Sequence, residues 1–181
     1  LNEKMFIPKF MNESMEYANE VLFKKSSEDE EFNGMGTTIT MAIIFKDELY
    51  VGHVGDSRAY ILRNDELIQI TQDHSFVGEL LRIGSITKEE AFNHPKKNIL
   101  NRAIGTNESV KVDVVTRELE DDDIVVLCTD GLINMVSEER IIDTIKNTES
   151  TADVCNILAN TANELGGIDN ITIMIMKNKK E

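Results

Sequence analysis

Three aspartates stand where apolar strands are expected to end or begin, and carboxylates are suited to holding a cation. Asp73 follows ELIQITQ, Asp130 ends IVVLCTD, and Asp169 in GGIDN precedes ITIMIM. Carboxylates gathered at one edge of a sheet repel one another unless a cation neutralises them. All-oxygen ligation suits Mg²⁺ or Mn²⁺ better than zinc. Taken singly, each aspartate is better explained by a turn or a helix cap, so the spacing alone leaves both interpretations open.

The composition limits the classes of function. The chain has 181 residues with 41% hydrophobic content, which suits one compact domain. Its 33 acidic residues against 19 Lys and Arg give a net charge of −14. Such a surface repels phosphate backbones, so nucleic-acid binding is not expected. No apolar run approaches the roughly 20 residues that span a bilayer, so no membrane interaction is expected either.

The two cysteines and the first residues indicate the compartment. Cys128 and Cys155 occur without a CxxC motif or a nearby histidine, which argues against a zinc site or a disulfide framework. We expect both to be small core residues in a reducing cytosol, so a cytoplasmic location is predicted. The start is not a secretory signal, because Pro8 and Lys9 interrupt its short apolar stretch. It begins with Leu1, and a fragment or a processed piece is therefore expected.

Hydrophobic periodicity predicts the elements of the first half. Met11, Met15, Ala18 and Leu22 share one helical face, which predicts a helix over about 9–25. Runs rich in β-branched residues, with tight turns between them, then predict an antiparallel meander. Its four strands are expected at 37–45, 49–57, 58–63 and 66–71.

The second half begins with a segment that interrupts the strand pattern. Thr87 and Glu90 form a capping-box pattern within it, so short helices are expected there. Strands are predicted to resume at 110–119 and 124–130. Two helices, capped by Ser137 and Ser150, and a last strand over 170–177 complete the chain. Helices segregated from antiparallel strands indicate an α+β fold.

Several short motifs occur in an order that is more specific than any one of them. They resemble the metal-dependent serine/threonine protein phosphatases, the PPM or type 2C family, in its bacterial form. The similarity covers nearly the whole chain from Gly34 onward. The motifs are GTT (36–38), VGDSRAY (54–60), TQDHS (71–75), NILNRAIGT (98–106), CTDGL (128–132) and GGIDNIT (166–172).

This resemblance implies a fold and a set of site residues. The fold would be an αββα sandwich, two antiparallel sheets flanked by helices, forming a single domain over 1–181 with a flap inserted at 76–100. Asp130 and Asp169 match two ligands of the family's binuclear metal centre, and Asp73 matches the residue that, with Asp130, holds a third metal. Residues expected to support the ligands or the local structure are Asn170, Gly131, Asp56 and Arg58.

The same resemblance implies a reaction. Two or three Mn²⁺ or Mg²⁺ ions would activate a bridging water for hydrolysis of phosphoserine and phosphothreonine in proteins. No catalytic residue beyond the metal ligands and no other cofactor is expected. The partners would be phosphoprotein substrates, in opposition to a serine/threonine kinase, and the protein would be a monomer.

The sequence also departs from the family pattern. The family's R-x-x-N-x-D and D-G-x-G-G-H segments, which carry a bridging aspartate, a histidine and a phosphate-binding arginine, do not occur. His53, His74 and His94 lie in other motifs and are expected to be structural or surface residues. We therefore predict an N-terminally incomplete domain with little or no activity. The alternatives are a PPM-like binding or regulatory domain without catalysis, and an acidic metal-binding domain of unrelated function.

Overall fold

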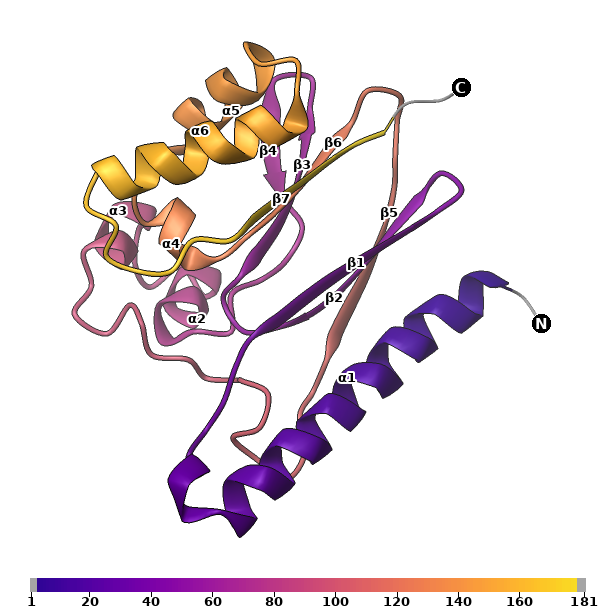
Figure 1. The fold of residues 1–181 in the computed structure, drawn as a ribbon, viewed down its shortest axis with the longest axis vertical. Helices are drawn as coiled ribbons and strands as arrows, with labels where there is room; N and C mark the ends of the chain where they lie inside the picture. Colours follow the sequence, from indigo (N-terminus) through magenta and orange to yellow (C-terminus); the bar gives the residue numbers. More distant parts are fainter. Residues whose placement is uncertain (1–2, 179–181) are drawn as a thin grey trace. The chain divides into compact units, whose positions relative to one another are not determined.

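A computed structural model describes residues 3–178, with side-chain environments from Phe6 onward (Figure 1). The order of elements follows the prediction, with two additional short helices over Glu30–Phe32 and Asp130–Ile133. No helix within the described residues is both long and apolar enough to cross a membrane. The elements are α1 (Glu3–Glu28), the 3-10 helix η1 (Glu30–Phe32), β1 (Ile39–Phe45), β2 (Glu48–Val54), β3 (Arg58–Arg63), β4 (Glu66–Gln69), α2 (Phe76–Arg82), α3 (Lys88–Phe92), β5 (Asp113–Glu118), β6 (Ile124–Cys128), α4 (Asp130–Ile133), α5 (Glu138–Lys146), α6 (Thr151–Glu164) and β7 (Ile173–Lys177).

The strands form two antiparallel sheets that are flanked by helices, so the predicted α+β class is confirmed. One sheet has the order β1-β2-β5 and the other the order β4-β3-β6-β7. The expected four-stranded meander is wrong, because β2 and β3 belong to different sheets. Two hairpins, β1–β2 and β3–β4, replace it. The chain passes from one sheet to the other at residues 55–57, within the VGDSR motif.

The chain divides into two compact units, and each is described by itself. The first runs up to Asp56 and resumes over Gln72–Arg117. The second combines Ser57–Thr71 with the chain from Glu118 onward. Each unit therefore contains one of the two sheets.

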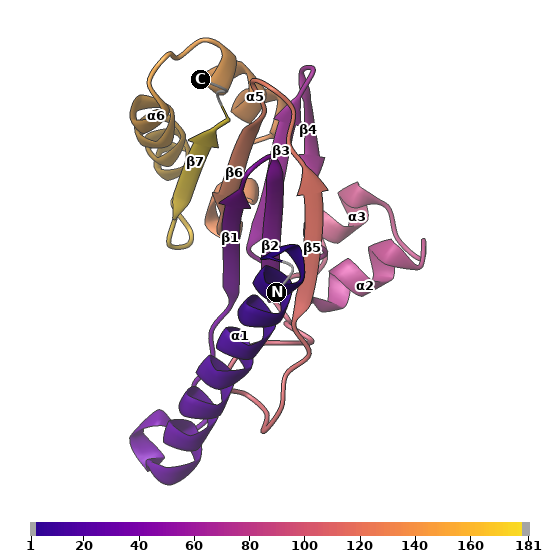
Figure 2. The ribbon, with the colours of Figure 1, turned by 90° about the vertical axis from the view of Figure 1, so that its right-hand side faces the viewer.

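In the first unit, α1 packs over β2. Met11 and Met15 are buried, and a Cβ atom added at Gly52 would lie 2.9 Å from the Met15 sulfur. The helix extends beyond the predicted 9–25 at both ends, and Pro8 lies inside it. A proline inside a helix removes one hydrogen-bond donor and crowds the preceding turn, and the buried methionine face stabilises the helix around it. The C-terminal half of α1 extends past the strands (Figures 1 and 2).

In the second unit, the four-stranded sheet packs against α5 and α6. Val126 on the central strand β6 is buried together with Tyr60 on β3. Leu158 and Ala162 on α6 are fully buried in the same cluster, as their spacing predicts. The predicted caps form, because Ser137 and Ser150 each accept a hydrogen bond from the backbone of the first helical turn.

Arg63, the last residue of β3, forms an ion pair with Asp123, the residue before β6. The Arg63 guanidinium donates to both carboxylate oxygens of Asp123, at 2.9 and 2.6 Å, and to the Glu118 carbonyl oxygen. Asp123 also accepts the Glu120 N–H at 2.7 Å, so the 118–123 turn is organised around these two side chains. The Asp123 side chain is only 1% exposed and Arg63 25%. Although partial burial raises the pKa of Asp123, the bonds from Arg63 and Glu120 hold it below its ordinary value.

Candidate functional site

Asp130 lies where the central strand of the second unit meets a helix. Strand β6 ends at Cys128, Thr129 is the N-cap residue, and Asp130 is the first residue of α4. The expectation that the strand runs through Asp130 into an Asp-Gly turn is therefore wrong. Its CTDGL pattern places Asp130 at a strand-to-helix junction, where its partly buried carboxylate is carried by two regular elements.

Hydrogen bonds join the segment around Asp130 to the segment around Asp169. The Thr129 N–H donates to the Thr172 carbonyl oxygen at 3.1 Å. The Thr129 hydroxyl donates to the Asn170 carbonyl oxygen at 3.2 Å and accepts the Thr172 N–H at 3.0 Å. Thr129 precedes Asp130 and Asn170 follows Asp169 in the chain. The bond between them therefore brings Asp130 and Asp169 to the same end of the four-stranded sheet.

Gly131 is required by the closeness of these two segments. A Cβ atom added at Gly131 would lie 2.3 Å from the Asn170 carbonyl oxygen, so no side chain fits. Asp169 is exposed, and its Oδ1 accepts the Asn170 N–H at 2.7 Å. This bond orients the Asp169 carboxylate. The Asn134 amide lies 3.5 Å from the Asp130 carboxylate, at the limit of a hydrogen bond.

These two residues fit part of a metal site. Carboxylate oxygens are the ligands that Mg²⁺ and Mn²⁺ prefer, and such ions are often held by one or two carboxylates with water in the remaining positions. Among the described residues no group of three or more His, Cys, Asp or Glu is arranged to hold a metal. Asp130 and Asp169 can therefore serve one ion, and they do not by themselves make a binuclear centre.

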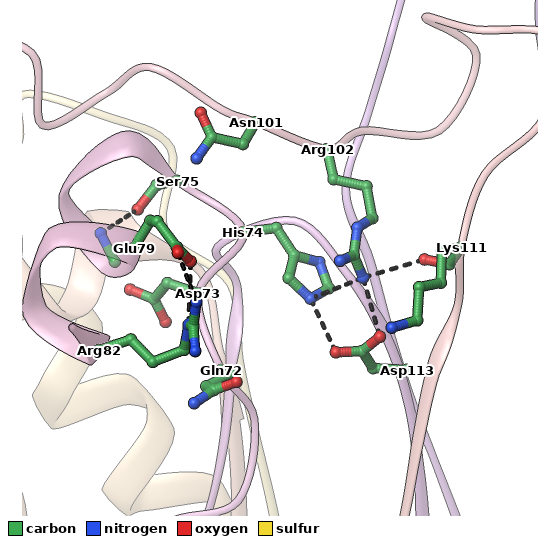
Figure 3. A pocket seen from close by; sticks show the side chains of 11 residues that line it. Gln72, Asp73, His74, Ser75, Glu79, Arg82, Asn101, Arg102, Lys111 and Asp113 are labelled. Carbon is green, nitrogen blue, oxygen red and sulfur yellow. Dashed lines mark hydrogen bonds and ion pairs between the residues drawn. The ribbon is translucent and has the colours of Figure 1, made fainter.

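Asp73 belongs to the first unit, in the segment between β4 and α2. This segment is fixed on both sides. The His74 N–H donates to the Gly55 carbonyl oxygen at 2.7 Å, and the His74 carbonyl oxygen accepts the Asn101 N–H at 2.8 Å. Asp73 helps to line a pocket of about 350 Å³, and most of the residues that line it are polar or charged (Figure 3).

A buried histidine organises one side of this pocket. His74 Nδ1 accepts the Gly55 N–H at 3.1 Å, so the proton of the neutral ring is on Nε2. Nε2 then donates to Asp113 Oδ2 at 3.1 Å. Arg102 Nη1 donates to Asp113 Oδ1 at 2.8 Å and to the Lys111 carbonyl oxygen at 3.1 Å. Figure 3 shows His74 and Arg102 meeting at Asp113.

Burial and neighbouring charges together determine the protonation of this cluster. Burial lowers the pKa of His74, and the Arg102 charge adds to this effect despite the bond to Asp113. Partial burial raises the pKa of Asp113, but the bonds from His74 and Arg102 outweigh it and keep the pKa below the ordinary value. His53, whose ring centre lies 4.7 Å from that of His74, is 1% exposed, and burial lowers its pKa to about 4. Both histidines are therefore neutral at pH 7.

The other predicted residues lie at the junction of β2 with β3 and in the loop after α3. Asp56 lies in the bend that follows β2, and Arg58 is the first residue of β3, where its Nη1 donates to the Tyr60 hydroxyl at 3.1 Å. His94 accepts the Lys96 N–H at 3.0 Å in the loop after α3, which is a structural contact.

The sequence alone does not indicate the roles of Arg102 and Asp113. Arg102 lies inside NILNRAIGT, one of the quoted motifs, but its partner is 11 residues away on β5. The one available signal was an acid, Asp113, between the apolar residues Val112 and Val114 of the predicted strand 110–119.

The chain was compared with protein families and with curated relatives. A sequence model of the protein phosphatase 2C family matches residues 2–171. Serine/threonine phosphatase Stp of Listeria welshimeri is 45% identical over 157 residues, which are 87% of this chain and 62% of that protein. Protein phosphatase PhpP of Streptococcus pneumoniae is 40% identical over 154 residues, 85% of this chain and 63% of that protein. The chain thus spans less than two thirds of the length of these two relatives.

Solved structures show the same similarity. The serine/threonine phosphatase Stp1 from Staphylococcus aureus superposes with a TM-score of 0.90 at 33% identity, covering 96% of this chain and 68% of that one. The catalytic domain of the phosphatase PstP, solved with two manganese ions, has a TM-score of 0.77 at 35% identity, covering 87% of this chain and 64% of that one. The chain belongs to the protein phosphatase 2C family.

Proposed function

We propose that this protein hydrolyses phosphoserine and phosphothreonine in proteins, in a reaction that requires Mn²⁺ or Mg²⁺. The observation that carries the proposal is the hydrogen-bonded pairing of the Asp130 and Asp169 segments in a chain of the phosphatase 2C family. The relatives reported above are named serine/threonine phosphatases, and one related structure contains manganese.

In this proposal the side chains bind and orient, and none acts as a nucleophile. Asp130 and Asp169 would hold a divalent ion, and Asp73 would be a ligand of a further one. When bound, such ions would supply an activated water for attack on phosphorus and would offset the charge of the phosphoryl oxygens. Gly131 and Asn170 keep the two carboxylates together by the close contact of their backbones.

Several narrower proposals accompany this function. Asp56 and Arg58 have structural roles near the junction of β2 and β3. Residues 76–100, which contain α2 and α3, act as a flap that influences substrate choice within a single domain. The partners are phosphoproteins made by a serine/threonine kinase in the bacterial cytoplasm, and the protein is a monomer. Cys128 is a packing residue, since it is buried in β6.

We further propose that the 181-residue chain by itself turns over slowly or not at all. The described residues contain no group of three or more metal-ligating side chains, which supports this expectation. The measurement is p-nitrophenyl phosphate hydrolysis by the purified chain, with and without Mn²⁺. Rapid turnover that depends on Mn²⁺ would contradict it.

The lack of a larger group of metal-ligating side chains among the described residues also favours a second candidate, a binding or regulatory domain without catalysis. Asp130→Asn separates the two functions, with Asp143→Asn on the exposed surface of α5 as the matched control. If Asp130 is a ligand, Mn²⁺ broadens the amide NMR signals around Asp130 and Asp169 in the original chain and in the control, but not in Asp130→Asn. Phosphopeptide hydrolysis, wherever it is measurable, is lost in the same variant. Equal broadening in all three proteins would refute a metal site at Asp130.

A further inference from the structure

A second pocket of about 550 Å³ lies in the first unit, beside the one that contains Asp73. The Thr37 N–H donates to the Ile104 carbonyl oxygen at 3.0 Å, and the Ile104 N–H donates to the Thr37 carbonyl oxygen at 2.8 Å. A Cβ atom at Gly36 would lie 2.7 Å from the Thr106 methyl group, so Gly36 allows the two loops to approach. The side chains of Thr37, Thr106, Asn101, Asn107 and Arg102 contribute the polar lining.

This pocket has a fixed outer wall. The side chain of Asn19 on α1, 1% exposed, donates to the carbonyl oxygens of Asn107 and Glu108 at 3.0 and 3.3 Å. Its amide oxygen accepts the Gly105 N–H at 2.8 Å. The loop over residues 103–108 is therefore held in place by a buried side chain.

Arg102 lines both pockets and is anchored at one end. Its Nη1 donates to Asp113 and to the Lys111 carbonyl oxygen as described above, and it lies 3.0 Å from His74 Nε2, whose proton is directed to Asp113. Its Nε and Nη2 make no hydrogen bond with the described residues, and its side chain is 28% exposed. The side-chain amide of Asn101, which also lines both pockets, makes none with those residues either. Adjacent side chains thus present unused donors from a positioned guanidinium and an amide.

The charge of the pocket suits an anion. Arg102 is the one charged residue among those described as lining it, in a chain whose net charge is −14. Asp113 offsets part of the Arg102 charge. Lys111, in the adjoining pocket, makes no ion pair with any described residue and adds a positive charge nearby. The Nε–Nη2 edge of a guanidinium matches the two oxygens of a carboxylate or phosphate.

We propose that this pocket, the Arg102 pocket, binds an anionic group on the substrate protein: a carboxylate or second phosphate that flanks the phosphoserine or phosphothreonine. The inference rests on the proposed function, because the flanking position follows from Arg102 also lining the pocket of the proposed ligand Asp73. Substrates with acidic residues beside the phosphorylated residue are then preferred over those with neutral ones.

Two phosphothreonine peptides test this, one with glutamates beside the phosphothreonine and one with glutamines in their place. Each is titrated in metal-free buffer while the Arg102 Nε–H and Asn101 amide NMR signals are followed. We expect the glutamate peptide to shift both signals and to bind about 5- to 20-fold more tightly. Arg102→Lys keeps a positive charge for Asp113 but loses the two-donor edge, so the preference falls to about twofold or less. Lys111→Met, an exposed and unpaired position, lowers it by about 2- to 3-fold.

The matched control is Arg117→Lys, an exposed arginine on β5 outside both pockets, which keeps the full preference. Equal binding of the two peptides by the original chain overturns the proposal. So does a full preference in Arg102→Lys whose amide spectrum shows the native fold. A peptide with phosphoserine in place of the glutamates separates the sources, because tighter binding than the glutamate peptide assigns the pocket to a second phosphate and weaker binding assigns it to a carboxylate.

Phosphate release from the same peptides with Mn²⁺ tests the proposed function separately. Peptides that bind through Arg102 but are not hydrolysed count against the phosphatase function and support the anion pocket. If both peptides are hydrolysed equally and bind equally, the result supports the phosphatase function and counts against the anion pocket.

Discussion

Gly131→Ala is the sharpest test of how the two aspartates are held together. The added Cβ would lie 2.3 Å from the Asn170 carbonyl oxygen and 3.3 Å from an Ile171 side-chain carbon. An ordinary contact needs roughly 3.4 Å, so the backbones must separate by about 1 Å. The nearest atom is a backbone carbonyl oxygen, which cannot rotate away as a side chain can.

Two effects of opposite sign compete in this variant. Alanine in place of glycine in a helix normally stabilises by about 1 kcal/mol, and Gly131 lies in α4. Forcing an extra carbon into a packed site costs about 1–3 kcal/mol, and the Thr129 bonds to Asn170 and Thr172 add about 1 kcal/mol each if they lengthen. The steric effect wins, and a net loss of about 1–3 kcal/mol lowers the melting temperature by about 2–10 °C.

The assay combines calorimetry with Mn²⁺ titration by NMR. Moving the carboxylates apart by about 1 Å should weaken Mn²⁺ binding about 10- to 100-fold, as disturbing the supports of a metal ligand commonly does. Gly84→Asn is the control, because no atom lies within 4 Å of a Cβ there and asparagine tolerates its φ of +69°. A Gly131→Ala protein that melts at or above the original temperature and binds Mn²⁺ equally well would refute this reasoning.

Three further predictions concern the structure that surrounds the two pockets and the sheets. Arg63→Met leaves the Asp123 carboxylate buried without its charged partner and should lower the free energy of unfolding in urea by about 3 kcal/mol. His53 has a pKa of about 4 against an ordinary 6.5, so the folded state favours the neutral ring. That contribution is complete above pH 6.5 and is lost as the pH falls towards 4, which amounts to about 2–3 kcal/mol of unfolding free energy. Asn19→Ala removes the three bonds that hold the 103–108 loop, and amide hydrogen exchange at Gly105 should become at least tenfold faster.

Each of these has a control or an outcome that would contradict it. Lys146→Met removes an exposed ion pair with Asp65 in the same unit as Arg63 and should cost less than about 1 kcal/mol. A loss as small as this for Arg63→Met would show that the buried pair is dispensable. His53→Gln should flatten the stability change between pH 6.5 and 4, and an unchanged slope would assign it to other groups. For Asn19→Ala, unchanged exchange at Gly105 would mean that the loop is held by other contacts.

Local chemistry made much of the fold predictable. The Asn64–Asp65 turn was recognisable, and both residues have positive φ, as a tight two-residue hairpin requires. The caps at Ser137 and Ser150 were likewise local signals. Strand partners were not predictable, because a period-2 pattern shows which face is buried but not which strand lies alongside, and β3 pairs with β6 some 60 residues later.

The candidate site was likewise predictable only in part. Asp130 and Asp169 were found by their motifs, and their joining through Thr129 follows from the pairing of β6 with β7. The ligand roles themselves stay predictions. The contacts of His74 with Asp113, 39 residues along the chain, depend on tertiary structure that periodicity does not encode.

The pairing of β3 with β6 has a consequence for synthesis on the ribosome. Strand β3 ends at Arg63 and β6 begins at Ile124, so the β3–β4 hairpin emerges long before the strand that covers its open edge. At about 5–20 residues per second, roughly 3–12 s separate the two events. During that interval the row of unpaired backbone groups on Tyr60 and Leu62, which face β6 in the folded protein, can pair with another chain. Aggregation during expression should therefore begin at β3, and chaperones that bind extended segments should recognise nascent chains that stop before residue 124.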